Sequence, residues 1–164
     1  GGATDAALAG AIAGLDSIAD ALGYTGTKKQ EYIDAETAKL YEKYYGADAN
    51  KEAGSKGLTG EEKDKFVDDY IKERIKEFEK NQIDEIDEQY RGATGAMKQA
   101  ESVARKAVTR LTSSRSKLHK MYIMKLKDAI SLMQTQSIAA ARKAILDKGT
   151  TNESYVFNGM DVIY

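Results

Sequence analysis

Not one proline occurs in the 164 residues of this chain. An average sequence of this length contains about eight prolines, at roughly 5%. Because proline breaks helix interiors and builds rigid turns, its absence permits long uninterrupted helices and removes polyproline linkers. We therefore expect an all-α fold in which glycine ends the helices.

The chain also lacks the side chains of many catalytic and metal sites. It has no cysteine and a single histidine, His119. Disulfides, thiolate metal sites, Fe–S clusters and a cysteine nucleophile are therefore excluded. The 25 Lys+Arg nearly balance the 26 Asp+Glu, which gives a formal net charge of -1. We expect no enzymatic activity, no cofactor, no metal ion and no small-molecule substrate.

We expect neither a membrane-spanning segment nor a signal peptide in the sequence. No stretch reaches the roughly 18 apolar residues that a membrane span needs. The most apolar run, residues 6–22, contains Asp16 and Asp20 and lacks the basic start of a signal peptide. The chain begins at Gly1 rather than at methionine, which indicates a processed chain or a fragment.

Apolar side chains recur at spacings of three and four in the first part of the chain, as on one face of a helix. They predict a small-residue helix over 4–22, a second helix over 27–45 and an acidic helix over 60–91. A Gly-rich polar loop is expected over 46–59, with Gly46 ending the helix before it. Two glycines within residues 92–95 favour a tight turn between two helices that form a hairpin. A close-packing point within one continuous helix is the alternative.

The strongest pattern lies in the last third of the chain. Leu111, Tyr122, Met133 and Ala144 recur every eleven residues. An eleven-residue repeat keeps one face of a nearly straight helix apolar. It predicts one very long amphipathic helix over 96–148, about 78 Å in length at 1.5 Å per residue. The expected architecture is a single elongated helical hairpin or bundle over 1–164.

The residues after this helix change character to β-branched and aromatic. Asn158-Gly159 lies between two such runs and is a signal for a type I′ turn. We expect a small β-hairpin or an extended docking tail over 150–164. Because a lone hairpin is marginal in water, this tail should dock on the helices or pair with another subunit. Its candidate contact residues are Tyr155, Val156, Phe157, Val162, Ile163 and Tyr164.

Two further features are typical of subunit contacts. Ala6, Gly10 and Gly14 recur at spacing four, which lets another helix backbone approach closely. An ordinary packed helix is the alternative. Arg115 lies at the centre of the apolar stripe of the long helix, where it could set register or oligomeric state. A buried guanidinium needs a partner, and we expect an acidic residue from the helix over 60–91, with a bound anion as the alternative.

Lysine and arginine residues line the side of the long helix opposite its apolar stripe. This basic stripe consists of Lys98, Arg105, Lys106, Arg110, Lys117, Lys120 and Lys127. We expect it to point outward. Its alternative partners are solvent, the acidic face of a neighbouring subunit, nucleic acid and an anionic membrane.

Together these features are typical of a building block. We expect a non-enzymatic, self-assembling structural protein that forms a ring, tube or filament with itself or with other helical structural subunits. In composition and layout the chain is similar to virion components, such as phage internal, ejection or tail-type proteins, and to secreted helical filament subunits. A virion or extracellular assembly is therefore favoured over the cytoplasm. The alternative is a membrane-active or nucleic-acid-binding helical module that uses the basic stripe. A compact helical enzyme or ligand carrier ranks last.

Overall fold

The computed structural model describes residues 2–121 and 128, and every regular element in this part of the chain is an α-helix. The elements are α1 (Gly2–Ala21), α2 (Gly26–Ser55), α3 (Gly60–Gln89) and α4 (Gly95–Thr112). Residues 114–121 are helical again. The expected all-α class is thus confirmed for the described residues. The chain divides into two compact units, residues 1–115 and 116–164, and the first of them holds α1 to α4.

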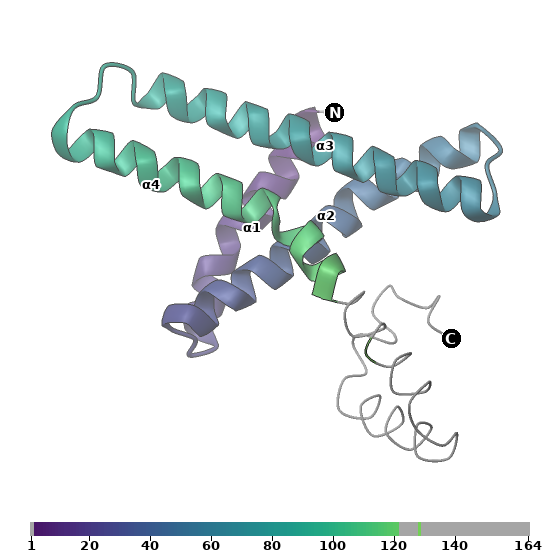
Figure 1. Cartoon of the computed structure of the whole chain (residues 1–164), viewed down its shortest axis with the longest axis horizontal. Helices are drawn as coiled ribbons and strands as arrows, with labels where there is room; N and C mark the ends of the chain where they lie inside the picture. Colours follow the sequence, from purple (N-terminus) through teal and green to yellow (C-terminus); the bar gives the residue numbers. More distant parts are fainter. Residues whose placement is uncertain (1, 122–127, 129–164) are drawn as a thin grey trace, which may run out of the picture. The chain divides into compact units, whose positions relative to one another are not determined.

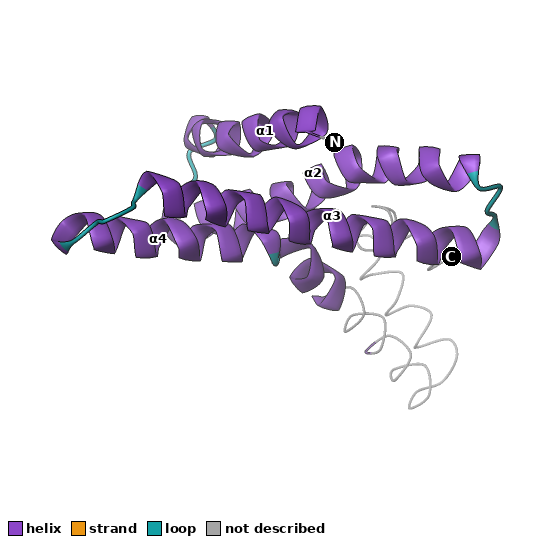
Figure 2. Cartoon of the chain, turned by 90° about the horizontal axis from the view of Figure 1, so that it is seen from above, coloured by secondary structure: helices purple, strands orange, loops and turns teal. Residues whose placement is uncertain are grey.

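Within residues 1–115 the helices form successive antiparallel hairpins (Figures 1 and 2). Helix α1 packs on α2, α2 on α3 and α3 on α4, and α2 makes a smaller contact with α4. Both views show α3 and α4 side by side. The chain turns between these two helices at residues 90–94.

The core of this unit lies where α1, α2 and α3 meet. Leu8, Tyr41, Tyr45 and Ile71 are completely buried there, and Phe78 is nearly so. Tyr41 packs edge-on against Phe78, with the ring centroids 6.2 Å apart. Because side chains four residues apart share one face of a helix, α2 presents both tyrosines to this core.

Helix α2 extends ten residues beyond the end that the sequence pattern predicts. The prediction that Gly46 ends the helix is wrong, and of the loop expected over 46–59 only residues 56–59 lie outside a helix, because α2 continues to Ser55. Gly46, Ala49 and Ala53 are all buried. A Cβ atom on Gly46 would lie 3.9 Å from Cδ1 of Ile71 on α3. The small residues that look like a loop in the sequence are therefore buried positions of α2, and at Gly46 they let it approach α3.

The three turns between these helices share one sequence motif. Gly-x-Thr-Gly occurs at residues 23–26, 57–60 and 92–95, at intervals of 34 and 35 residues. Both glycines of each turn have a positive φ, between 54° and 80°, which glycine adopts without steric cost. Each threonine is extended, with φ between -140° and -137°, and occupies the N-cap position of the next helix. A repeated turn therefore organises this part of the chain.

The very long helix predicted over 96–148 is interrupted at Ser113, since α4 ends at Thr112 and helix resumes at residue 114. Neither glycine nor proline causes the break. Instead, the hydroxyls of Ser113 and Ser114 donate to backbone carbonyls three residues earlier, at 2.9 and 2.7 Å. Such bonds from serine and threonine bend helices. Most of the remaining predicted range, and the β tail expected over 150–164, lie outside the described residues.

Candidate functional site

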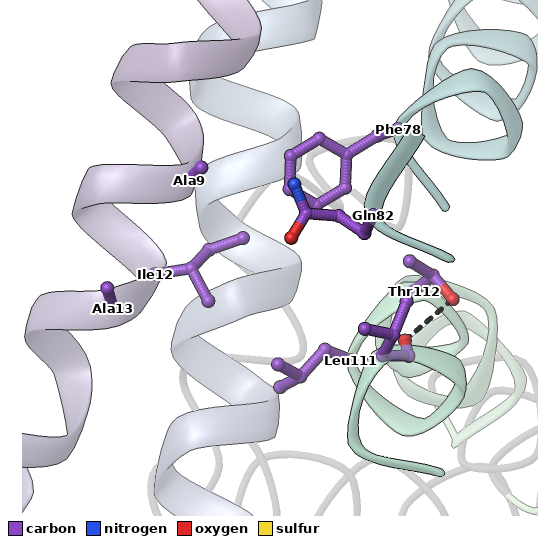
Figure 3. Close-up of a pocket in the computed structure, with 8 residues that line it drawn as sticks. Ala9, Ile12, Ala13, Phe78, Gln82, Leu111 and Thr112 are labelled. Atoms are coloured by element: carbon purple, nitrogen blue, oxygen red, sulfur yellow. Dashed lines mark hydrogen bonds between the residues drawn. The ribbon is translucent and has the colours of Figure 1, made fainter. Parts of the chain in front are cut away.

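An apolar pocket of about 170 Å³ lies between α1, α3 and α4 (Figure 3). Small and branched apolar side chains and one aromatic ring form its walls. These apolar residues are Ala9, Ile12, Ala13, Phe78, Val108 and Leu111. Ala9 and Ala13 lie four residues apart on α1, and their short side chains leave space that the larger side chains of α3 and α4 do not fill.

Two polar side chains, Gln82 and Thr112, complete the lining of the apolar pocket. The Thr112 hydroxyl is already engaged, because it donates to Oε2 of Glu79 at 2.7 Å. The Gln82 side chain makes no hydrogen bond to another described residue. Figure 3 shows its carboxamide directed from α3 toward α1, between Phe78 and Ile12. One uncharged donor and acceptor group therefore faces an otherwise apolar space.

A buried arginine on α3 ties α1 and α2 to that helix. The Arg74 side chain is 12% exposed, and its Nη2 lies 3.3 Å from Oδ1 of Asp5 on α1. Its Nη1 donates to the Tyr70 hydroxyl at 2.9 Å and lies 3.6 Å from Oδ2 of Asp48 on α2. The guanidinium also covers the ring of Tyr45, with Cζ 4.7 Å from the centroid. These five residues, the Arg74 cluster, compensate a buried charge with partners from three helices.

The carboxylate of Asp5 also accepts a hydrogen bond from Tyr45, another member of the Arg74 cluster. The Tyr45 hydroxyl donates to Oδ1 of Asp5 at 2.8 Å. Burial first, and then this hydrogen bond, raise the pKa of Tyr45 well above its usual value. Burial works to lower the pKa of Arg74, but its interactions with Asp5 and Tyr70 outweigh burial and raise that pKa. Tyr45 therefore stays neutral and Arg74 stays charged at neutral pH.

Arg115 has the kind of partner that the sequence predicts. Its Nη2 donates to Oδ1 of Asp68 on α3 at 2.8 Å, and its Nε donates to Oε1 of Glu42 on α2 at 2.5 Å. The expected acidic partner from the helix over 60–91 is thus confirmed. Burial works to raise the pKa of Asp68, but hydrogen bonds from Lys72 and Arg115 outweigh it, and the pKa lies below its usual value. These contacts lie within one chain, so a role of Arg115 in oligomeric state stays a prediction.

The prediction that the basic stripe points outward is wrong for two of its members. Arg105 pairs with Asp87 on α3, and Nε of Arg110 lies 3.1 Å from Oδ1 of Asp34 on α2. The reason is that α4 packs against both α3 and α2, so part of the face opposite its apolar stripe is also covered. The exposed members of the stripe are Lys98, Lys106, Lys117 and Lys120. Lys127 lies outside the described residues, as do the tail positions Tyr155, Val156, Phe157, Val162, Ile163 and Tyr164.

The outer face of α1 consists of small side chains. The predicted contact residues Ala6, Gly10 and Gly14 are all exposed. A Cβ atom at Gly10 or Gly14 would meet no other atom within 4 Å. Helical spacing places four more exposed residues beside these three. We name the whole set the small-residue face: Ala3, Ala6, Ala7, Gly10, Gly14, Ser17 and Ala21.

All three carboxylates of α1 interact with other helices of the same chain. Asp5 belongs to the Arg74 cluster. Asp16 and Asp20 lie 2.9 Å and 2.8 Å from Nζ of Lys29 on α2. The small-residue face therefore carries no charged side chain.

The Arg74 cluster and the apolar pocket were not predicted from the sequence. Arg74 is separated from Asp5 by 69 residues, and no spacing rule connects them. The pocket is assembled from three helices, and each of its six apolar side chains is an ordinary apolar position on its own helix. The signal that would have helped is the repeated Gly-x-Thr-Gly turn, because it marks the three junctions between α1, α2, α3 and α4.

No helix in residues 2–121 is both long and apolar enough to cross a membrane. Among the same residues no group of three or more His, Asp or Glu side chains could hold a metal ion. In comparisons with known proteins, no family model, no curated protein and no solved structure matches the chain.

Proposed function

We propose that this chain is a non-enzymatic structural subunit that self-associates through the small-residue face of α1. The observation that carries this proposal is the distribution of charge on α1. Its three carboxylates interact with α2 and α3, whereas its outer face holds only alanine, glycine and serine. Such a face suits the close approach of a second helix.

The small-residue face is long and already ordered. A helix of 20 residues, the length of α1, spans about 30 Å. Leu8, Leu15 and Ala19 are buried beneath it, so the helix is held in place before any partner arrives. Alanine and glycine lose little side-chain entropy in a contact. Association on this face therefore avoids much of the ordering cost that weakens other interfaces.

Two larger apolar side chains border the small-residue face. Ile18 is 48% exposed and Leu22 is 54% exposed. Exposed apolar side chains next to a flat, uncharged surface favour protein contact. A second copy of the chain that packs a different surface against this face would cover them, and repetition of such a head-to-tail contact would build a ring, tube or filament. A virion component or a secreted filament subunit is the class of protein that we propose.

Nucleic-acid or anionic-membrane binding through the basic stripe is the alternative function, and it has less support. Such binding requires free positive charges that neutralise phosphates. Arg105 and Arg110 are already paired with Asp87 and Asp34 in the same chain. Lys98 pairs with Glu101, which leaves Lys106, Lys117 and Lys120 as the remaining exposed charges of the stripe in residues 2–121.

The test is the assembly state at physiological salt, measured by light scattering and then by negative-stain imaging of the same sample. Gly10→Leu and Gly14→Leu should weaken assembly, because a leucine on this face keeps a second helix away. Gly54→Leu is the matched control, since Gly54 is also an exposed helical glycine with no atom within 4 Å of its Cβ position. A wild-type protein that stays monomeric, or equal assembly of all three variants, would overturn the proposal.

A further inference from the structure

The apolar pocket between α1, α3 and α4 has the composition of a binding site for a small molecule. Ligand pockets are mostly apolar and contain a few polar groups that orient the ligand. Six of the eight residues that line this pocket are apolar, and none is charged. Its volume of about 170 Å³ is close to that of an engineered protein cavity of about 150 Å³ that binds benzene.

The Gln82 carboxamide gives the pocket one specific polar requirement. The side chain makes no hydrogen bond to another described residue, and its amide is directed between Phe78 and Ile12 (Figure 3). The nearby hydroxyl of Thr112 is occupied by Glu79 at 2.7 Å. A ligand therefore finds one free donor and acceptor group in the pocket.

We propose that the apolar pocket binds a small neutral molecule with a compact aromatic or branched aliphatic body and one hydrogen-bonding group. The body fills the space beside Ala9 and Ala13, where an aromatic ring can contact the ring of Phe78. The polar group bonds to Gln82. A charged ligand is disfavoured, because no group of opposite charge lines the pocket to offset its loss of hydration.

Binding at this place would also have a structural consequence. The pocket takes its walls from α1, α3 and α4, whereas α1 otherwise packs mainly on α2. A bound ligand would therefore join α1 to the hairpin of α3 and α4. Because the ligand binds the folded state, it should raise the unfolding temperature, and this rise should grow with the logarithm of the ligand concentration above the Kd.

The experiment is a titration of the full chain with benzene and with phenol, followed by NMR chemical shifts and by thermal unfolding. Phenol has the same ring as benzene and adds one hydroxyl group. We expect saturable binding of both probes, with phenol about tenfold tighter because of one hydrogen bond to Gln82. The Gln82→Leu variant should bind phenol about tenfold more weakly than wild type and benzene at least equally well.

A second variant tests whether the probes bind in the apolar pocket. Ala9→Leu should fill the pocket and abolish binding of both probes, whereas Ala96→Leu changes an exposed position of α4 and should bind them as wild type does. Circular dichroism checks that each variant is folded. The proposal is wrong if neither probe binds saturably, if benzene and phenol bind equally well, or if the folded Ala9→Leu variant keeps its affinity. If Ala9→Leu does not fold, the proposal is tested by the affinity of Gln82→Leu for phenol, and it is wrong if that affinity equals the wild-type value.

Discussion

The guanidinium of Arg74 and the carboxylate of Asp5 lie 3.3 Å apart, although 69 residues separate them in the sequence. This contact joins α3 to α1, two helices that otherwise share little surface. Asp5 also accepts a hydrogen bond from Tyr45 of α2. The Asp5 carboxylate therefore holds α1 against both α2 and α3, the two helices with which α1 forms the core.

Replacement of Arg74 should destabilise the protein strongly. Arg74→Met leaves Asp5 and Asp48 near the core without their cation, and we expect a loss of about 2 kcal/mol in the free energy of unfolding. Lys76→Met is the control on the same helix, because Lys76 forms an exposed pair with Glu73, and such pairs contribute less than about 1 kcal/mol. Urea unfolding of both variants makes the measurement, and equal losses would contradict a structural role for the cluster.

The ion pairs of Asp68 with Lys72 and Arg115 should make stability depend on pH in the acid range. The pKa of Asp68 is lowered in the folded protein, so the unfolded chain binds a proton more readily than the folded one. The contribution of this carboxylate is present above the pKa of the unfolded state, near pH 4, and is lost as the pH falls through the folded pKa.

Asp68→Asn isolates this contribution. The variant should be less stable than wild type at pH 7 by about 0.5 kcal/mol, a value reduced by solvent screening of a half-exposed pair. The difference should shrink as the pH falls from 5 to about 2. Denaturant unfolding at each pH measures it, and a difference that stays constant with pH would show that the charge of Asp68 is not responsible.

The Gly-x-Thr-Gly turns should be sensitive to any side chain at their glycines. Gly57→Ala places a Cβ atom on a backbone with φ of +68°, and we expect a cost of about 1 kcal/mol. Gly54→Ala, three residues earlier in α2, has open space around its Cβ position and should instead stabilise by about 0.5 kcal/mol. Thermal unfolding of the two variants should show shifts of opposite sign.

The close approach of α2 and α3 at Gly46 can be tested by side-chain size. In Gly46→Ala the new methyl group lies 3.9 Å from Ile71, an ordinary contact, so the higher helix propensity of alanine should add about 1 kcal/mol of stability. Gly46→Leu overfills the same place and should cost about 1–3 kcal/mol. If both variants were stabilised, Gly46 would not be a packing position.

Local sequence signals predicted a large part of this fold. The spacing of apolar residues located α1 and α3 closely, and two glycines in four residues predicted the hairpin between α3 and α4. The position of Arg115 in an apolar stripe predicted an acidic partner from α3, and Asp68 is that partner. In each case the deciding information lies within one helix or one turn.

Two of the errors arose where contact between two helices determines whether a residue is buried or paired. Gly46 looks like a helix stop, but Ile71 of α3 makes it a packing position. Arg110 lies on the polar side of α4, but it pairs there with Asp34 of α2 instead of pointing into solvent. The break at Ser113 is instead a local error, because it depends on the hydroxyls of Ser113 and Ser114 that bond to the backbone, which an eleven-residue apolar period does not reveal.

Because the Gly-x-Thr-Gly turns have nearly the same backbone conformation, a segment that runs from one turn to the next ends in equivalent junctions. Tandem duplication or deletion of such a segment would leave the neighbouring junctions intact. Each turn also reverses the direction of the chain, so one added helix would invert everything that follows it, whereas two added helices would restore the original direction. The architecture can therefore gain or lose length most simply in pairs of helices.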